Sequence, residues 1–340
     1  MDKIVAVDLF CGAGGLTAGL RKAGVKVVKG IDIDSEVEKT YKLNNPGSTF
    51  LNRDISEITA EDLIQGINRQ NDLFLLAGCA PCQPFSLQNR TKRRDKRKSL
   101  MKQVGRLIDL TKPDLVLVEN VPGFINKKNR YHTEFIGILK KHKYFFSEGI
   151  LNARDYGVPQ NRRRYVLFAS LRSKVSLPEA TYGPGKLDYV TVKDAIAKYP
   201  RIKAGGSSKS FPNHSSRILS DLNLERLMII PKDGGSRNSL PKALELKCHN
   251  EHNGHYDVLG RMRWDKPAPT LTCKCTSITN GRYGHPTQNR GISLREAAAL
   301  QTFSDDYIFY GSKTSIAKQI GNAVPVLLAQ KLGFALIATN

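Results

Sequence analysis

Cys82 stands in a stretch whose residue types could carry out covalent chemistry, Gly78-Cys79-Ala80-Pro81-Cys82-Gln83-Pro84-Phe85-Ser86. The apolar run before it, 73–77, is short enough for a buried strand. Two prolines and a glycine then exclude both a helix and a continued strand. Cys82 is therefore expected in a rigid turn at the carboxyl end of a strand, where open α/β sheets place their chemistry. A cysteine there is a candidate nucleophile, and the alternatives are a buried structural thiol and a redox or metal pair with Cys79.

Glu119 is a second reactive residue type at the expected tip of a strand. It follows the expected strand 114–118 and stands shortly before Pro122. A further strand is expected over 161–168, and strand alternation would put Arg162 and Arg164 on one face of it. The alternative for these two arginines is a basic stripe on the surface.

The beginning of the chain has the order strand, glycine turn and helix. Residues 4–10 are a strand candidate, Cys11-Gly12-Ala13-Gly14-Gly15 follows, and 16–23 has helical spacing. This order is typical of a Rossmann-like sheet, in which glycines let the backbone approach a ligand closely. The third glycine of the dinucleotide fingerprint would fall at Thr17, so the fingerprint is incomplete and speaks against a nicotinamide dehydrogenase.

Two acids follow at positions suited to a nucleoside cofactor. Asp32 is expected at the end of a second strand, where a carboxylate can accept both ribose hydroxyls. Its alternative role is a helix N-cap, which Asp34 or Ser35 could fill equally well. Asp54 follows the turn 45–48 and could reach an adenine amino group, and its alternative is a turn or cap residue.

The charge balance is strongly basic. Lys and Arg number 53 against 31 acids among 340 residues, which gives a net charge of +22. We interpret this as a sign of a polyanionic partner, most simply nucleic acid, with mere solubility as the alternative. The segment 87–98 is expected to be a loop that clamps phosphates, and its basic residues are Arg90, Lys92, Arg93, Arg94, Lys96, Arg97 and Lys98. A solvated face is the alternative for this segment.

The cysteines predict no disulfide framework. Six of them are irregularly spaced along the chain, which suits a reducing compartment. The spacing does not predict a zinc site, because no standard finger is matched by Cys248, His249, His252, His255, Cys273 and Cys275. The first residues lack the apolar core of a signal peptide, and no run approaches the ~18 apolar residues of a membrane span. A soluble intracellular protein is expected.

The composition changes from about residue 177, where Gly, Ser, Asn and Pro rise and the βα rhythm ends. A second domain of β and irregular character is expected there, with one helix over 222–230. Ser293 and Glu296 form a capping box that begins a helix reaching Gln301. A last helix is expected over 325–336. No internal repeat is visible.

In order and spacing, these motifs resemble the cytosine-5 DNA methyltransferases of restriction–modification systems. The resemblance covers about the first 170 and the last 50 residues. It is carried by DLFCGAGGL, Asp32, Asp54, PCQPFS, ENV, QNRRR, SLREAAALQTF and QIGNAVP. It implies an α/β fold with a Rossmann-like S-adenosylmethionine-dependent methyltransferase sheet and a smaller, mostly β or irregular, target-recognition domain. The implied domains are 1–176 for catalysis and cofactor binding, 177–290 for target recognition and 291–340 for a return to the catalytic domain.

The resemblance also implies roles for particular residues. It makes Cys82 the nucleophile, Glu119 the acid, and Arg162 and Arg164 the basic residues beside the cytosine. The implied cofactor-binding residues are Phe10, Gly12, Gly14, Asp32, Ile33, Asp54, Ile55, Asn322 and Val324. The implied DNA-binding residues are Arg90, Arg93, Arg94, Arg97, Ser86, Gln160 and Thr270. No metal is implied. The sequence departs from the family at Ile33, where an aromatic residue is frequent, and at Ala80, where Phe or Pro is frequent.

The implied chemistry explains the residue types. Carbon 5 of cytosine is a poor nucleophile, and addition of the Cys82 thiolate to carbon 6 makes it enamine-like and able to accept the sulfonium methyl. Glu119 as a protonated carboxyl would relieve the charge that develops at ring nitrogen 3. Arg162 and Arg164 would bind the base carbonyl and phosphate. The cytosine must be flipped out of the duplex for this chemistry.

The partner implied is double-stranded DNA, and the product of the cofactor is S-adenosylhomocysteine. A monomer on DNA is expected in a prokaryotic or phage-infected cytoplasm, near the nucleoid, with a cognate restriction endonuclease that makes no stable contact. A tRNA cytosine-5 methyltransferase of the same fold and a DNA-binding relative without catalysis are the alternatives. The recognition sequence cannot be read from the chain.

Overall fold

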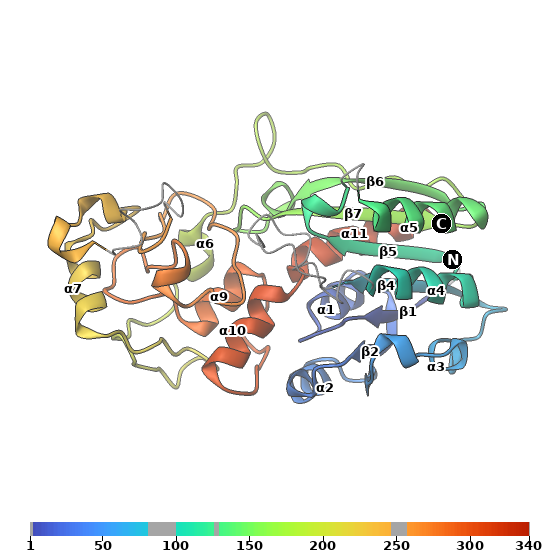
Figure 1. Cartoon of the computed structure of the whole chain (residues 1–340), viewed down its shortest axis with the longest axis horizontal. Helices are drawn as coiled ribbons and strands as arrows, with labels where there is room; N and C mark the ends of the chain where they lie inside the picture. Colours follow the sequence, from blue (N-terminus) through green and yellow to red (C-terminus); the bar gives the residue numbers. More distant parts are fainter. Residues whose placement is uncertain (1–2, 81–99, 126–128, 246–256, 340) are drawn as a thin grey trace. The chain divides into compact units, whose positions relative to one another are not determined.

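The computed structural model describes residues 3–80, 100–125, 129–245 and 257–339 (Figure 1). The chain divides into two compact units, each described by itself. Unit 1 consists of residues 1–156, 163–180 and 324–340. Unit 2 consists of residues 157–162 and 181–323. The chain therefore returns to unit 1 at Val324, whereas the sequence predicted a return at residue 291. Cys82 and the basic segment 87–98 lie outside the described residues.

Unit 1 is built on one seven-stranded sheet with the order β3-β2-β1-β4-β5-β7-β6. Every neighbouring pair is parallel except those that involve β7, which runs antiparallel to both β5 and β6. The fold class predicted from the sequence is confirmed. The strands are β1 (Lys3–Leu9), β2 (Lys26–Asp32), β3 (Thr49–Asn52), β4 (Asp72–Cys79), β5 (Leu115–Asn120), β6 (Phe145–Asn152) and β7 (Arg163–Ser170).

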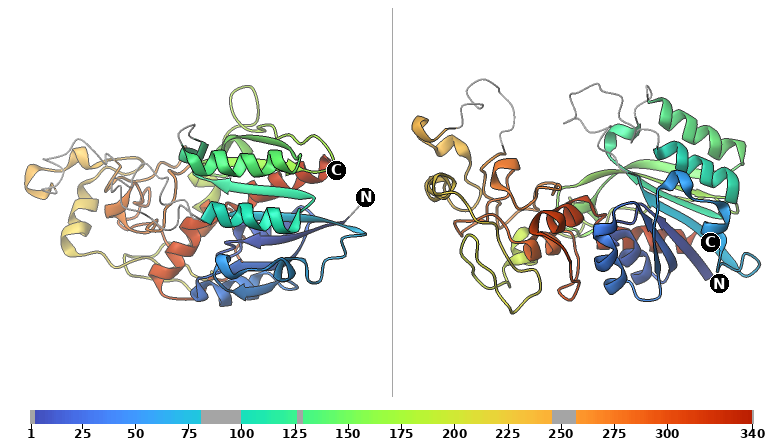
Figure 2. Two further views of the ribbon diagram at one scale, coloured as in Figure 1. Left: turned by 45° about the vertical axis from the view of Figure 1, so that its right-hand side comes forward. Right: turned by 60° about the horizontal axis from the view of Figure 1, so that its bottom comes forward.

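Helices cover both faces of this sheet (Figure 2). One face carries α1 (Gly15–Lys22), α2 (Glu38–Asn44) and α11 (Val326–Ala338). The other carries α3 (Ala60–Ile64), α4 (Leu100–Thr111) and α5 (Arg130–Lys141). Apolar side chains of β1, β4, β5 and β7 pack with those of α4 and α5 in one hydrophobic core cluster of the unit. Short 3-10 turns follow four strands, namely η1 (Ser35–Val37), η2 (Ile55–Glu57), η5 (Pro122–Ile125) and η6 (Ala153–Tyr156).

Unit 2 is irregular, as the composition after residue 177 predicted. Its short helices are α6 (Val192–Ile196), α7 (Asp221–Ile229), α9 (Leu294–Leu300) and α10 (Lys313–Asn322), with 3-10 turns η7 (Arg237–Ser239), η8 (Lys242–Leu244) and η9 (Ile278–Asn280). Its described residues form isolated β-bridges and no strand. The expected capping box is present, because Ser293 accepts from the Glu296 backbone while the Glu296 side chain accepts from that of Ser293.

Buried arginines replace strand pairing inside unit 2. The Arg261 guanidinium donates to the carbonyls of Leu227, Ile230, His285 and Gln288 and to the side chain of Asn289. Burial lowers the pKa of Arg261 to about 10. Arg295 in the same way donates to the carbonyls of Pro212, Ser304 and Tyr307. Buried carbonyls must find donors, and these side chains supply them where no ladder does.

The stretch Lys313–Ala338 is the one candidate membrane span in the described part of the chain, by length and composition alone. No apolar run of this length was expected from the sequence. The stretch is interrupted by Ala323, Val324 and Pro325 and consists of α10 and α11. Of the apolar window, 56% is buried inside the structure, which is the burial expected of core helices.

The close approach of α1 and α11 predicts opposite effects for two glycine substitutions. An added Cβ at Gly19 would overlap with the Cβ of Ala329 and the carbonyl of Val326, whereas one at Gly137 in α5 would meet nothing within 4 Å. We expect Gly19→Ala to lower the free energy of unfolding by about 1–3 kcal/mol. Gly137→Ala should raise it by about 0.5–1 kcal/mol through helix propensity. Urea denaturation of both variants measures this, and equal effects would show that α1 does not need a glycine here.

Candidate active site

The turn after β1 depends on left-handed backbone conformations. Phe10, Gly12 and Gly14 have φ angles of 57°, 51° and 88°. Gly14 is also the N-cap of α1, with no side-chain cap. An added Cβ at Gly12 would meet nothing within 4 Å, so open space adjoins this part of the turn. The turn therefore offers a backbone surface that a ligand can approach closely, beside the N-terminus of a helix.

Asp32, at the end of β2, holds this turn. Its Oδ2 accepts from the Gly12 backbone N–H at 2.8 Å, and its Oδ1 accepts from that of Asp34 at 2.9 Å. The alternative role of N-cap belongs to Asp34, which accepts from the Glu36 N–H at 3.1 Å and begins η1. The side chain of Ile33, next to Asp32, is an apolar group that is 67% exposed.

Asp54 acts as a cap residue, which was the alternative to a contact with adenine. Its Oδ1 accepts from the backbone N–H and hydroxyl of Ser56 at 2.8 and 2.7 Å, and these bonds lower the pKa of Asp54. Ile55 is buried in the core of unit 1. Asn322 is exposed at the end of α10, whereas Val324 is buried.

A buried carboxyl lies within β1, behind the glycine turn. Asp8 is fully buried, and its Oδ2 accepts from the Thr17 hydroxyl at 2.6 Å, which in turn contacts the Tyr41 hydroxyl at 3.1 Å. No described residue bonds Asp8 Oδ1. Burial raises the pKa of Asp8 to about 7. The same burial raises the pKa of the Cys11 thiol well above its ordinary value.

Glu119 lies on β5 at the carboxyl edge of the sheet and contacts side chains from the strands on both sides. It is paired with Cys79 of β4 and with Val166 of β7, so the side chains of Cys79, Glu119 and Arg164 share one face. The Cys79 thiol donates to Glu119 Oε2 at 2.6 Å. Arg164 Nε lies 2.9 Å from Glu119 Oε1, and the two groups form an ion pair. Their contact does not have the geometry of a hydrogen bond. Glu119 is 1% exposed and Arg164 11%.

Asn120 ties the end of β5 to the end of β4. It is fully buried, its Nδ2 donates to the Ala80 carbonyl at 3.4 Å, and its Oδ1 accepts from the Val121 N–H at 2.8 Å. No role was assigned to Asn120 from the sequence, and the contact of Cys79 was not expected. The only available signal was that Asn120 is polar and directly follows Glu119 in an apolar strand. Cys82 follows Ala80 by two residues and lies beyond the described part.

Arg162 and Gln160 are buried within unit 2. The Arg162 guanidinium donates to the carbonyls of Leu271, Gly321 and Ala323 at 2.9, 3.3 and 3.0 Å. Arg162 precedes β7, so strand alternation does not relate it to Arg164. The Gln160 amide donates to Leu300 and Gln301 and accepts from Leu271. Thr270 donates to the carbonyl of Asn161. A direct contact of Gln160 with DNA would require these bonds to break.

The remaining DNA-binding candidates, Ser86, Arg90, Arg93, Arg94 and Arg97, lie outside the described residues, as do Cys248, His249, His252 and His255. Among the described residues, no group of three metal-ligating side chains comes together. Cys275 is buried and donates to the Ala317 carbonyl at 3.6 Å, and burial raises the pKa of its thiol to about 12. A neutral thiol of this kind is a poor metal ligand.

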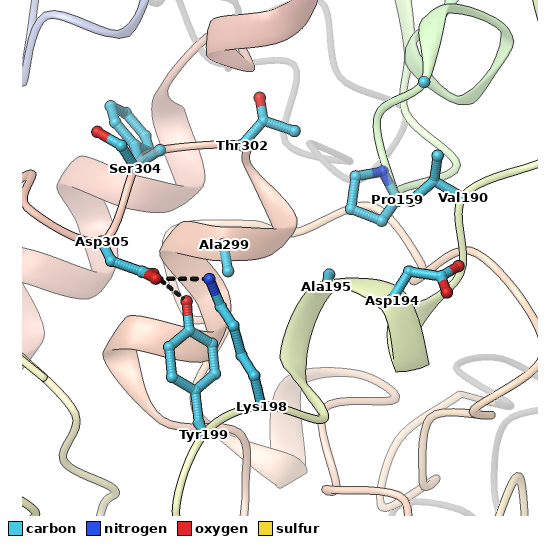
Figure 3. Close-up of a pocket in the computed structure, with 12 residues that line it drawn as sticks. Pro159, Val190, Asp194, Ala195, Lys198, Tyr199, Ala299, Thr302, Ser304 and Asp305 are labelled. Carbon is cyan, nitrogen blue, oxygen red and sulfur yellow. Dashed lines mark hydrogen bonds and ion pairs between the residues drawn. The ribbon is translucent and has the colours of Figure 1, made fainter. Parts of the chain in front are cut away.

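A cavity of about 250 Å³ lies within unit 2 (Figure 3). Its polar groups satisfy one another, because Asp305 accepts from both Lys198 and Tyr199 at 2.5 Å. Asp194, on its other side, belongs to the capping box of α6 with Thr191. The cavity contains none of the sequence-predicted site residues.

The parallel sheet with its antiparallel β7, the glycine turn beside Asp32 and the buried Glu119 define a methyltransferase of the class that acts on a nucleobase. The chain belongs to the C-5 cytosine-specific DNA methylase family, whose model matches residues 4–338. As a member, it transfers a methyl group from S-adenosylmethionine to carbon 5 of cytosine in DNA.

Relatives match along nearly the whole chain. It is 38% identical over 332 residues to the Type II methylase M.HgiDII of Herpetosiphon aurantiacus, covering 95% of this chain and 92% of that one. It is 33% identical over 339 residues to the Type II methyltransferase M1.HphI of Haemophilus parahaemolyticus, covering 98% and 87%. Its fold is similar to the solved structure of the S. pombe Dnmt2 methyltransferase, with a TM-score of 0.68 at 19% identity and 99% of each chain covered.

The raised pKa of Asp8 predicts a pH dependence of stability. The folded state holds the proton up to about pH 7, whereas an unfolded chain releases it near 3.9. The stabilising contribution is thus complete below pH 4 and is lost as the pH rises through 7, with a slope approaching about 1.4 kcal/mol per pH unit. Asp8→Asn keeps the neutral form and should remove this slope.

Urea denaturation between pH 5 and 8 measures the slope. Asp265→Asn is the control, because that side chain is 67% exposed and should leave the slope as in the wild type. An Asp8→Asn variant with the wild-type slope would show that Asp8 is ionised in the folded protein.

Proposed function

We propose that the protein is the protective methylase of a restriction–modification system, acting on one specific sequence of double-stranded DNA. The Type II names of its relatives support this role, and the net charge of +22 suits a polyanionic substrate. We propose further that it works as a monomer in a prokaryotic or phage-infected cytoplasm at the nucleoid. A cognate endonuclease would share the cell without stable contact.

The groups at the ends of β1 and β2 fit a nucleoside cofactor with a positive charge. Gly12 leaves open space, Ile33 exposes an apolar side chain, and Asp32 places a carboxylate at the end of β2 beside the glycine turn. We assign Asp32 to the ribose hydroxyls, Ile33 and Asp54 to the adenine, and the turn at Phe10, Gly12 and Gly14 to the amino-acid end. Ile55, Asn322 and Val324 would support this site. The bound cofactor supplies the methyl group as a sulfonium.

We assign the bond-making role to Cys82, whose thiolate adds to carbon 6 of the cytosine and leaves after carbon 5 has lost its proton. Glu119 would hydrogen-bond ring nitrogen 3 and moderate the charge that develops there. Its location at a strand tip, between donors on both neighbouring strands, is the observation that carries the proposal. Arg164 would hold Glu119 and reach the base. Arg162 would be a positioning residue, because three carbonyls occupy its guanidinium.

We propose that sequence is read within unit 2, from residues 177–290. Arg90, Arg93, Arg94 and Arg97 would contact phosphates without reading bases, with Ser86 beside them. Gln160 and Thr270 would support the recognition residues through the backbone, as their contacts inside unit 2 suggest. Catalysis and cofactor binding would belong to 1–176 and to the last helix.

Bisulfite sequencing of DNA from cells that express the protein tests the proposal. We expect protection of cytosines in a single short sequence context. Protection scattered over unrelated contexts would contradict sequence-specific recognition, and methylation of tRNA with none of DNA would overturn the assigned substrate.

Cys82→Ala should abolish methyl transfer while duplex binding survives, because the thiolate makes a bond but no phosphate contact. A duplex with 5-fluorocytosine at the target should trap the wild type covalently, since fluorine on carbon 5 cannot leave as a proton does. A denaturing gel measures the trapped complex. Turnover in Cys82→Ala would disprove the assignment of the nucleophile.

Asp32→Ala should weaken S-adenosylmethionine binding more than DNA binding, because hydrogen bonds to a charged carboxylate are worth roughly 1.5–3 kcal/mol each. Asp34→Ala is the matched control, since Asp34 caps η1 in the same segment. Calorimetry with the cofactor measures both. Equal losses in the two variants would mean that Asp32 acts only through the fold of the turn.

A further inference from the structure

The Cys79 thiol, which contacts Glu119, has no assigned role of its own in the function described so far. Cys79 is the last residue of β4, and β4 lies between β1 and β5 in the sheet. The register places Gly78 beside Leu9 of β1 and Cys79 beside Glu119 of β5. The end of β4, which carries the thiol, is therefore paired with β1 at Gly78 and with β5 at Cys79. The sheet, and not a loop, sets the distance between the thiol and Glu119.

The carboxyl of Glu119 has a different neighbour on each oxygen. Oε1 faces the Arg164 guanidinium and Oε2 receives the Cys79 thiol. A Glu side chain has three rotatable bonds, so a carboxyl with one partner could rotate about the contact that remains. Two partners from two strands fix both the plane of the carboxyl and its direction. Geometry of this kind matters for a group that must meet one ring atom of a substrate.

We propose that Cys79 is a positioning residue for methyl transfer, whose thiol holds Glu119 Oε2 so that the carboxyl meets the cytosine ring in the productive orientation. The inference rests on the proposed role of Glu119. The thiol acts through Glu119 and makes no bond to the substrate. Removing it should lower the turnover rate while the affinities for cofactor and DNA stay unchanged.

Steady-state kinetics of three variants tests the proposal. Cys79→Ala removes the donor and should lower kcat about tenfold, equivalent to about 1.4 kcal/mol of transition-state stabilisation. Cys79→Ser restores a donor of similar size and should stay within about threefold of the wild type. KM for cofactor and DNA should change less than about twofold in both. Thr133→Ala, at an exposed position of α5, is the control and should match the wild type throughout. Wild-type kcat in Cys79→Ala, or an equal loss in Cys79→Ser, would overturn the proposal.

A vibrational measurement tests the contact without turnover. The S–H stretching band of Cys79 is taken as the Raman difference between proteins with Cys79 and with Cys79→Ser, and it should move to higher frequency in the Glu119→Gln background, because an amide accepts more weakly than a carboxylate. Glu148→Gln is the control, since Glu148 bonds His132 and Tyr165 instead. An unmoved band would overturn the contact even if Cys79→Ala proved unstable.

The Glu119→Gln variant distinguishes a wrong role for Glu119 from a wrong role for Cys79. If Glu119→Gln kept wild-type kcat, the proposed role of Glu119 would be wrong, and Cys79 would lose its role in turnover whatever the Raman band showed. If Glu119→Gln lost activity while Cys79→Ala kept it, the function would stand and the role of Cys79 alone would be refuted.

Discussion

The burial of the Glu119 carboxyl is the constraint on which the arrangement of unit 1 depends. A carboxyl that is 1% exposed is costly to ionise unless partners compensate for the lost water. Those partners come from the strands on both sides, Cys79 of β4 and Arg164 of β7. Arg164 reaches this edge because β7 runs antiparallel to β5, which brings the beginning of β7 to the carboxyl ends of β4 and β5. A parallel β7 would leave its first residues at the opposite edge of the sheet.

Sequence patterns predicted those parts of unit 1 in which an apolar run ends in a polar residue. The strand that ends in Glu119 and Asn120 is of this kind, because a buried parallel strand is apolar throughout and its polar tip is conspicuous. β3 was missed because its four residues, Thr49–Asn52, are half-exposed and form no apolar run. The contact of Cys79 with Glu119 could not be predicted, since 40 residues separate the two and strand register is not a local property. Arg162 was expected on a strand face with Arg164, but the strand begins only at Arg163.

The interpretation of the basic charge is refined by where some of the arginines lie. Arg162, Arg261, Arg290 and Arg295 are among the largest fully buried side chains of the described residues. Their donors are used inside the fold, on carbonyls and on Glu296, so these four cations do not form part of a surface that faces phosphates. A sequence count cannot separate internal from external arginines, because both are surrounded by polar residues in irregular segments. Family membership establishes the DNA substrate independently of the charge.

The buried arginines also explain how the described part of unit 2 can be ordered without a sheet. Glu296 holds the beginning of α9 through its capping box and pairs with Arg290 through two bonds of 2.7 Å. Bidentate pairs of this kind fix geometry as well as charge. His285 lies beside the pair, and burial lowers its pKa to about 4, so it is neutral near pH 7 and adds no second cation. The carboxylate thus ties the start of a helix to the irregular segment before it. Side chains at a few positions supply these bonds, and the backbone pairing of the described residues between them is limited to isolated β-bridges.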